Sequence, residues 1–135
     1  MPAKYMLEII TPERIFFKGE VESVIIPTSD GYMSIQRMHE PMVIVLCIGV
    51  MKLNIDGEWK ECTTSSGFVG IRPDLTIIFS QAVEWPEEID IRRAQEAKEQ
   101  AEERMRQQQS YQEYMQNQIT LARAMVRLRV GRKGK

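Results

Sequence analysis

Histidine and cysteine are scarce in this chain of 135 residues, which contains one histidine and two cysteines. His39 has no second histidine to act with, and Cys47 and Cys62 do not form a Cys-x-x-Cys pair. Metal sites with nitrogen and sulfur ligands need several such residues at short, regular spacing. The sequence therefore predicts no metal site, and two reduced cysteines that pack inside apolar or strand-like segments.

A long apolar stretch is also missing. The longest apolar segment runs from Met42 to Met51 and is interrupted by Gly49, whereas a membrane-spanning helix needs about 20 apolar residues. The first residues, Met1-Pro2-Ala3-Lys4, lead directly into a strand-like segment and show no secretory signal. We expect a cytoplasmic protein, or one that is attached to a membrane only through a partner.

The sequence motifs of common enzymes are absent as well. There is no phosphate-binding Gly-x-x-x-x-Gly-Lys loop, no Gly-x-Gly-x-x-Gly loop, and no Gly-x-Ser-x-Gly around a nucleophilic serine. Glu87 and Glu88 are adjacent, and adjacent residues on a helix point apart, so they do not suit paired acid–base catalysis. A basic C-terminal end without interleaved aromatic residues is weak evidence for nucleic-acid binding. We expect neither an enzyme nor a nucleic-acid partner.

Charge is distributed unevenly along the chain. Residues 1–86 hold seven Lys and Arg against eleven Asp and Glu, a net −4, and residues 87–135 hold eleven against eight, a net +3. No acidic residue follows Glu113, but six basic residues do: Arg123, Arg127, Arg129, Arg132, Lys133 and Lys135. One explanation is the favourable interaction of cations with a helix C-terminus. The other is a surface for an acidic partner or a phosphate.

Residues 1–86 consist of short strand-like segments separated by turns. The continuous apolar segment from Met42 to Ile48 predicts a strand that is buried on both faces, and Asp56-Gly57 predicts a tight hairpin. No helix-length segment separates the strands, which favours an all-β sandwich over a parallel α/β sheet. The expected strands are Tyr5 to Ile10, Ile15 to Lys18, Val21 to Pro27, Tyr32 to Ile35, Met42 to Ile48, Val50 to Ile55, Trp59 to Thr64, Gly67 to Ile71, Leu75 to Ser80 and a short one at Gln81 to Val83.

Residues 87–135 predict an antiparallel pair of helices. The first follows Trp85-Pro86, opens with the segment from Ile89 to Ala94, and runs to about Gln107. Its apolar face is mostly alanine, which buries little area, so we expect a closely packed but weakly held pair. The residues of this face are Ala94, Ala97, Ala101 and Met105.

The second predicted helix is more apolar than the first. It runs from about Tyr114 to Val130, after a turn near Gln109 to Gln112, and Gly131 and Gly134 are expected to end it. Its surplus apolar surface must contact the sandwich or another protein. Two adjacent apolar rows provide that surface: Tyr114, Leu121, Met125 and Leu128 in one, and Met115, Ile119, Ala122 and Val126 in the other.

Asp90 and Arg93 are three residues apart and therefore share one side of the first helix. A local ion pair is the simplest interpretation, and it would contribute a few tenths of a kcal/mol. The alternative is half of a phosphate or nucleotide site, which Arg123 or Arg127 from the second helix would complete. The planar guanidinium groups of arginine suit phosphate oxygens.

Several short motifs, in their order and spacing along nearly the whole chain, resemble the epsilon-subunit family of bacterial F-type rotary ATP synthases. No single motif is specific, so the resemblance rests on the set. The motifs are Thr11-Pro12-Glu13, Phe17-x-Gly19-Glu20-Val21-Glu22-Ser23-Val24, Asp30-Gly31, His39-x-Pro41, Ser66-Gly67-Phe68, Glu84, Ile89-Asp90-x-x-Arg93-Ala94 and Arg123-Ala124-Met125-x-Arg127-Leu128.

The resemblance implies a non-catalytic central-stalk subunit with an N-terminal β-sandwich and a C-terminal helical hairpin. The sandwich would bind the gamma subunit and the membrane ring of c subunits, and would help to couple proton or sodium flow to ATP synthesis. The hairpin would fold down or extend into the catalytic head of alpha and beta subunits, where it inhibits ATP hydrolysis. The thin alanine face suits such a two-state element. The implied location is the cytoplasmic face of the cell membrane, as a peripheral subunit.

The resemblance also implies two sets of site residues. Contacts with gamma and the c-ring fall on Asp30, Gly31, Tyr32 and His39. A regulatory ATP, in members that bind one, falls on Glu84, Ile89, Asp90, Arg93, Ala94, Arg123 and Arg127. The chain departs from the family at Ser34, Arg37, Met38 and Met42, which replace Gly, Pro, Gly and Leu, and at Gln116, where ATP-binding members carry an arginine.

A rival hypothesis of another class is a free-standing β-sandwich adaptor whose helical hairpin docks a protein partner. It would share the predicted fold, and it would differ in having no gamma or catalytic subunits as partners.

Overall fold

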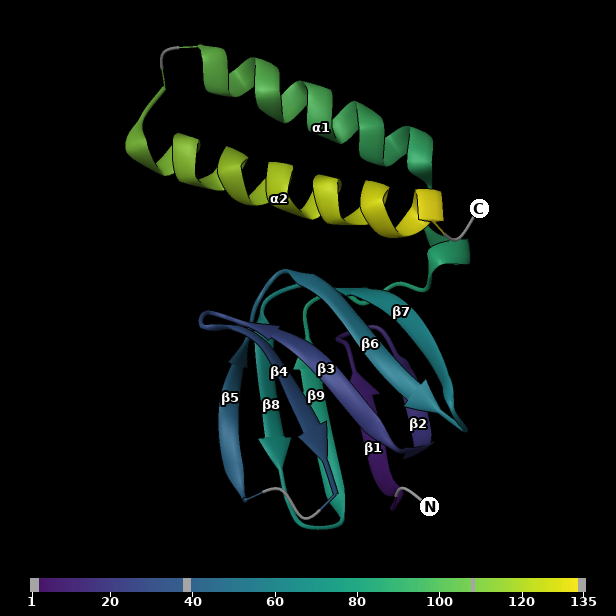
Figure 1. Cartoon of the computed structure of the whole chain (residues 1–135). Coiled ribbons are helices and arrows are strands. Elements are labelled where there is room, and N and C mark those ends of the chain that lie inside the picture. Colours follow the sequence, from purple (N-terminus) through teal and green to yellow (C-terminus); the bar gives the residue numbers. More distant parts are fainter. Residues whose placement is uncertain (1–2, 38–39, 108, 134–135) are drawn as a thin grey trace. The chain divides into compact units, whose positions relative to one another are not determined.

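The computed structural model describes residues 3–37, 40–107 and 109–133. The chain forms two compact units, Met1–Glu84 and Trp85–Lys135. The first contains the strands and the second contains the helices, as Figure 1 shows.

Nine strands form two sheets in the described part of the first unit. The five-stranded sheet has the order β2-β1-β9-β8-β5, and the four-stranded sheet has the order β4-β3-β6-β7. The predicted β-sandwich is therefore confirmed. The strands are β1 (Tyr5–Ile10), β2 (Ile15–Val21), β3 (Ser23–Thr28), β4 (Gly31–Gln36), β5 (Met42–Leu46), β6 (Gly49–Ile55), β7 (Glu58–Thr64), β8 (Gly67–Ile71) and β9 (Leu75–Ser80).

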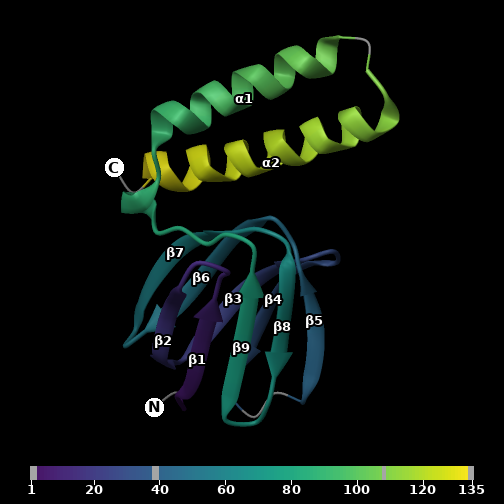
Figure 2. The same ribbon diagram turned by 180° about the vertical axis from the view of Figure 1, so that it is seen from behind.

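The first and last strands lie side by side in the centre of the five-stranded sheet. β1 and β9 pair in parallel, from Met6 opposite Leu75 to Ile10 opposite Phe79, while the other pairs among the described strands are antiparallel. A parallel pair needs a long connection, and here seven intervening strands provide it in place of a helix. Figure 2 shows this sheet in front of the other.

Alternating side chains from both sheets fill the space between them. On β1, Tyr5, Leu7 and Ile9 are buried, as the period of two for a strand requires. Their partners from the other sheet include Val24, Ile26 and Ile35, which have no exposed surface. The predicted Asp56-Gly57 turn is present, and both residues have positive φ, 51° and 83°.

Strand β5 differs from the prediction in its burial. Met42–Leu46 is the edge strand of its sheet, so the expectation of a strand buried on both faces is wrong. Val43 and Val45 expose 78% and 66% of their surfaces. An apolar run has the same sequence pattern whether its outer face is covered by the same chain or left open, which is why the prediction failed.

The segment after β9 is not a strand. Residues 81–83 have no strand assignment, contrary to the expectation, and the chain instead forms one isolated bridge between Thr63 and Glu84. Ser80 explains the change of direction, because its hydroxyl donates to the Ala82 carbonyl and also accepts from the Ser65 backbone N–H.

The second unit is an antiparallel hairpin of two long helices (Figure 1). A short 3-10 helix, η1 (Pro86–Glu88), precedes α1 (Ile91–Arg106), and α2 (Tyr111–Lys133) follows a turn. Ile89 has extended backbone angles, so α1 begins two residues later than expected. The Ser110 hydroxyl accepts from the Glu113 N–H and caps α2, which therefore begins before Tyr114.

The buried face of α2 also differs from the predicted rows. Ala124, Leu128, Val130 and Gly131 are buried, whereas Met125 is 52% exposed. Gly131 lies within the helix and does not end it, contrary to the expectation. Gly134 lies outside the described residues. Within the described ranges, neither helix is long and apolar enough to cross a membrane.

Candidate functional site

An apolar row crosses the outer face of the five-stranded sheet. Strand register places Ile15 opposite Ile10, Ile10 opposite Phe79, Phe79 opposite Phe68, and Phe68 opposite Val45. Residues opposite each other on paired strands point to the same face. We call these five residues the outer row.

The outer row is exposed and ordered by its own contacts. Phe68 and Phe79 expose 56% and 45% of their surfaces, and their ring centroids are 6.2 Å apart in a tilted arrangement. That geometry is favourable for an aromatic pair. A row of apolar side chains at this exposure is typical of a protein-docking surface.

A groove of about 700 Å³ follows the outer row. Ile10, Phe68 and Phe79 line it together with the Thr11-Pro12 turn and Ser66-Gly67. Gly67 has a specific role, because a Cβ there would overlap the Phe79 carbonyl oxygen. Glycine thus lets β8 approach the end of β9 where the groove forms. The five residues of the outer row carry no side-chain hydrogen-bonding group, so the groove suits an apolar side chain of a partner.

Three of the four residues predicted to contact gamma and the c-ring lie where β3 turns into β4. Gly31 has φ 107°, which only glycine adopts without strain. The Thr28 hydroxyl donates to the Gly31 carbonyl at 2.6 Å and accepts from the Asp30 N–H at 3.2 Å. Tyr32 is 61% exposed. The structure brings Asp30, Gly31 and Tyr32 together in one rigid, exposed turn, and His39 lies outside the described residues.

The carboxylate of Asp90 accepts a hydrogen bond from the backbone of α1. It accepts from the Arg93 N–H at 3.1 Å and caps the N-terminus of α1. The interaction expected between these two residues is therefore a capping bond to the main chain and not a side-chain ion pair. The Arg93 side chain is exposed.

Two other predicted nucleotide-site residues are packing residues in this fold. Ile89 and Ala94 expose only 1% and 3% of their surfaces. The Ile89 side chain lies against Gly131 of α2. Glu84 belongs to the first unit, where its N–H donates to the Thr63 hydroxyl and its carbonyl accepts from the Thr63 N–H.

Arg123 is the predicted nucleotide-site residue with an unsatisfied polar group. Its Nε is buried and has no hydrogen-bond partner among the described residues. Arg127, one turn further along α2, is half-buried. A buried N–H without an acceptor costs about 1–3 kcal/mol, so this position would gain from an incoming acceptor such as a phosphate oxygen. The residues present therefore fit an anionic ligand at this part of α2.

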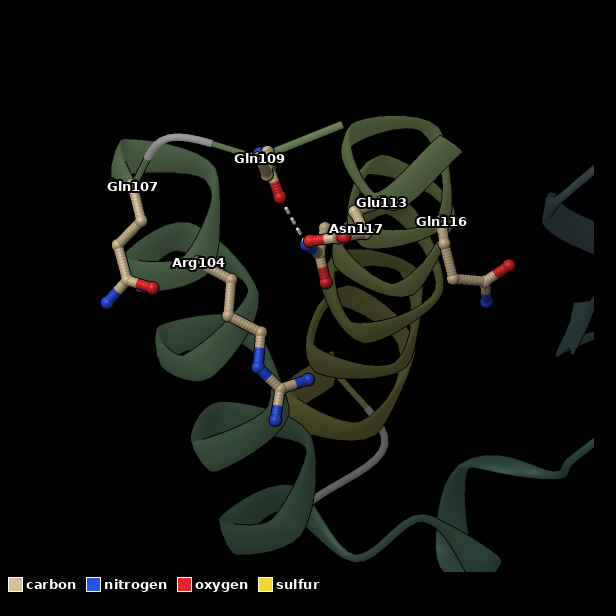
Figure 3. Close-up of a pocket in the computed structure, with 6 residues that line it drawn as sticks. All are labelled: Arg104, Gln107, Gln109, Glu113, Gln116 and Asn117. Atoms are coloured by element: carbon tan, nitrogen blue, oxygen red, sulfur yellow. Dashed lines mark hydrogen bonds between the residues drawn. The ribbon is translucent and has the colours of Figure 1, made fainter. Parts of the chain in front are cut away.

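The hairpin also contains a polar cleft that the sequence did not predict. Figure 3 shows its lining residues at the turn between the helices. The cleft has a volume of about 400 Å³. Asn117 Nδ2 donates to Gln109 Oε1 at 2.8 Å across it. The glutamine-rich segment indicated only a turn, because α1 and α2 must be paired before these residues can be seen to converge. The lining residues are Arg104, Gln107, Gln109, Glu113, Gln116 and Asn117.

This cleft lies at the opposite end of α1 from Asp90, one of the predicted nucleotide-site residues. Arg104 stands near the C-terminus of α1, whereas Asp90 caps its N-terminus. At a rise of about 1.5 Å per residue, the two ends of α1 are more than 20 Å apart. Gln116, the residue that replaces an arginine in the family pattern, lines the cleft.

Two family profiles match consecutive parts of the chain. The profile "ATP synthase, Delta/Epsilon chain, beta-sandwich domain" matches residues 4–86, and "ATP synthase, Delta/Epsilon chain, long alpha-helix domain" matches residues 87–131. Together they cover both structural units.

Curated relatives and solved structures agree with these profiles. The ATP synthase epsilon chain of Ruminiclostridium cellulolyticum is 45% identical over 126 residues, which are 93% of this chain and 94% of that one. The epsilon chain of Caldanaerobacter subterraneus subsp. tengcongensis is 44% identical over 134 residues, 98% of this chain and 97% of that one.

Among solved structures, a chain of the Euglena gracilis mitochondrial ATP synthase (OSCP/F1/c-ring) has a TM-score of 0.80 at 23% identity, covering 93% of this chain and 79% of that one. At that identity the likeness supports the fold alone. The profiles and the curated relatives show the family, and the resemblance noted in the sequence is confirmed: this chain belongs to the ATP synthase epsilon chain family.

Proposed function

We propose that the protein is a non-catalytic rotor subunit of an ATP synthase, which helps to couple proton or sodium flow to ATP synthesis. Membership of the epsilon chain family supports this role. The similar solved structures come from an F1/c-ring assembly and from a central stalk with c-ring. On this proposal the subunit works as a peripheral protein on the cytoplasmic face of the cell membrane.

The outer row is the observation that carries the proposal. It crosses five strands and ends at the exposed edge strand β5, so it offers a continuous apolar face. An exposed apolar face of this kind is typical of a surface that docks a partner, and a stalk subunit needs such a surface. We assign the outer row and its groove to the gamma subunit, whose apolar side chains would fill the groove.

The β3–β4 turn is the second proposed contact. Asp30, Gly31 and Tyr32 stand in a turn that two hydrogen bonds to the Thr28 hydroxyl help to order. We assign these residues, together with His39, to contacts with gamma and the c-ring. An exposed tyrosine in such a turn provides a large contact area at low entropic cost.

The helical hairpin is proposed as a brake on ATP hydrolysis. The buried residues of α1 are Ala94 and Ala101, so the two helices share little apolar area. Meanwhile α2 leaves Met115, Ile119 and Met125 exposed. A weakly held helix with apolar side chains on a second side suits an element that exchanges one packing for another. Its basic C-terminal end would meet acidic surfaces of the alpha and beta subunits.

A regulatory ATP is proposed for the hairpin because of Arg123. Its buried, unpaired Nε would donate to a phosphate oxygen, and Arg127 and Arg93 would add positive charge. ATP would supply the acceptors that the folded hairpin lacks. Asp90 would continue to cap α1, which keeps the start of the helix fixed.

Copurification tests the rotor role against the adaptor role. The tagged full-length chain is expected to bring down gamma and the catalytic subunits from cells, and the variant Phe68→Ser/Phe79→Ser is expected to lose gamma. The matched control is Trp59→Ser, which changes an exposed aromatic residue on β7 of the other sheet. Absence of gamma and the catalytic subunits with the unchanged chain would favour the adaptor.

A further inference from the structure

Gly131 occupies an unusual place for a glycine. It lies inside α2, three residues after the buried Leu128, and is itself buried. Glycine is a poor helix former, because it loses more backbone freedom than any other residue. A glycine at this position therefore needs a packing reason.

The reason is the close approach of α2 to the first residue of α1 and to the segment before it. A Cβ at residue 131 would lie 3.0 Å from Cγ2 and 3.3 Å from Cβ of Ile89, and 3.2 Å from Cγ1 of Ile91. These distances are shorter than ordinary van der Waals contacts between carbon atoms. Both neighbours are β-branched and have restricted χ1 angles, and Ile89 is 1% exposed. Neither isoleucine can easily move away from a larger residue.

A polar contact next to Gly131 supports the same junction. Arg132 Nη2 donates to Gln95 Oε1 at 2.9 Å, from the last turn of α2 to the first turns of α1. Further along the hairpin, the buried residues of α1 are the small Ala94 and Ala101, and those of α2 are Ala124 and Leu128. The base of the hairpin is thus where α2 meets large side chains, and Gly131 makes that contact possible.

We propose that Gly131 is the latch of the hairpin: the absence of a side chain lets α2 close on Ile89 and Ile91, and so sets the balance between the folded and the extended hairpin. This inference rests on the proposed role of the hairpin as a brake. A side chain at residue 131 disfavours the closed hairpin and leaves the extended one unaffected. The extended hairpin, which inhibits ATP hydrolysis, is then populated more often.

The variant Gly131→Ala distinguishes the effect of packing at residue 131 from the effect of helix propensity. Gly131→Ala raises the helix propensity of α2 whether the hairpin is closed or open. If Gly131 mattered only as a weak point in the helix, alanine would strengthen the hairpin. If it is a latch, alanine opens the hairpin despite the better propensity, and Gly131→Leu opens it further.

The test uses the full-length chain with spin labels at Glu99→Cys and Arg129→Cys, exposed positions on α1 and α2, in a Cys47→Ser background. Distances between the labels are measured by pulsed electron spin resonance. We expect a several-fold larger population of long distances for Gly131→Leu and a smaller increase for Gly131→Ala. The matched control is Gln118→Leu, which adds the same side chain at an exposed position of α2.

The same variants are then assembled with the remaining subunits, and ATP hydrolysis is measured. Stronger inhibition with Gly131→Leu than with Gln118→Leu is the expected result. An unchanged or shortened distance distribution in both Gly131 variants overturns the latch, whatever the hydrolysis rate. A longer distance without any change in hydrolysis upholds the latch and counts against the hairpin as a brake. If Gly131→Leu misfolds by circular dichroism, Gly131→Ala decides alone.

Discussion

The hydroxyl of Tyr5 donates to the backbone carbonyl of Ile35 at 2.6 Å, and this bond joins the two sheets of the sandwich through its interior. Tyr5 comes from β1 in one sheet and Ile35 from β4 in the other. Tyr5 is 4% exposed and Ile35 is fully buried. The tyrosine ring packs with the core while its polar end satisfies a carbonyl that water cannot reach.

Removing this hydroxyl is expected to weaken the sandwich. Tyr5→Phe keeps the ring but leaves the Ile35 carbonyl without this donor, so the free energy of unfolding should fall by about 1–2 kcal/mol. Urea denaturation followed by circular dichroism measures the change. Tyr32→Phe, at an exposed tyrosine, is the control and should have no effect. Equal stability of the Tyr5 variant and the unchanged chain would show that the bond contributes nothing net.

Alkaline pH is expected to unfold the sandwich through two buried groups. Burial raises the pKa of the Tyr5 phenol above 10.0 and the pKa of the Cys62 thiol above 9.0 in the folded state. Both groups bind their protons more tightly when folded, so their stabilisation is complete below these unfolded values and is lost as pH rises towards the folded ones. Each group should contribute a slope of about −1.4 kcal/mol per pH unit.

Denaturant titrations between pH 7 and pH 11 measure this slope. Stability should decline first above pH 9 and more steeply above pH 10. Tyr5→Phe should remove the steeper part, because phenylalanine does not ionise. A stability that stays level to pH 11 in the unchanged chain would contradict the assignment of these two groups as buried and neutral.

Deletion of residues 87–135 tests the brake. The truncated chain keeps the outer row and the β3–β4 turn, so it should still assemble with gamma and the c-ring. ATP hydrolysis by the assembled complex should rise, because no helix can enter the catalytic head. A complex that assembles normally and hydrolyses ATP at an unchanged rate would rule out inhibition by the hairpin.

Calorimetric titration of ATP into the isolated full-length chain tests the nucleotide site. Heat of binding is expected, and Arg123→Gln should weaken the affinity by about tenfold or more, as loss of a hydrogen bond to a charged group does. Arg129→Gln removes an exposed arginine from the same helix and should have little effect. Gln116→Arg should strengthen binding. No heat from the unchanged chain at millimolar ATP would exclude a useful site.

The strands and turns of the sandwich could largely be predicted from local sequence. Asp56-Gly57 fixed one hairpin, because its positive φ angles are readily adopted by this pair of residues. The parallel pairing of β1 with β9 could not be predicted, because no local pattern records which distant strand a segment will join. The predicted burial of Val43 and Val45 is wrong for the same reason, because the position of β5 at the sheet edge depends on the order of the strands.

The candidate site was only partly visible in the sequence. The spacing of Asp90 and Arg93 predicts that they lie close together, but whether the carboxylate bonds to a guanidinium or to the main chain depends on where α1 begins. The outer row could not be predicted from the sequence, because its members come from five strands and align only through the strand register. The sequence pattern predicts a helix end at Gly131, because its contact with Ile89, 42 positions earlier in the chain, is not a local feature.

The pairing of β1 with β9 has a consequence for how the protein is made. Residues 5–10 leave the ribosome before the other strands of the sandwich, yet one of their two strand neighbours is complete only when Ser80 has been added. Until then β1 pairs with β2 alone, and the other edge of β1 remains open to other chains. The sandwich therefore closes late and as one unit. Any gene product that stops before residue 75 lacks the strand that completes the sheet.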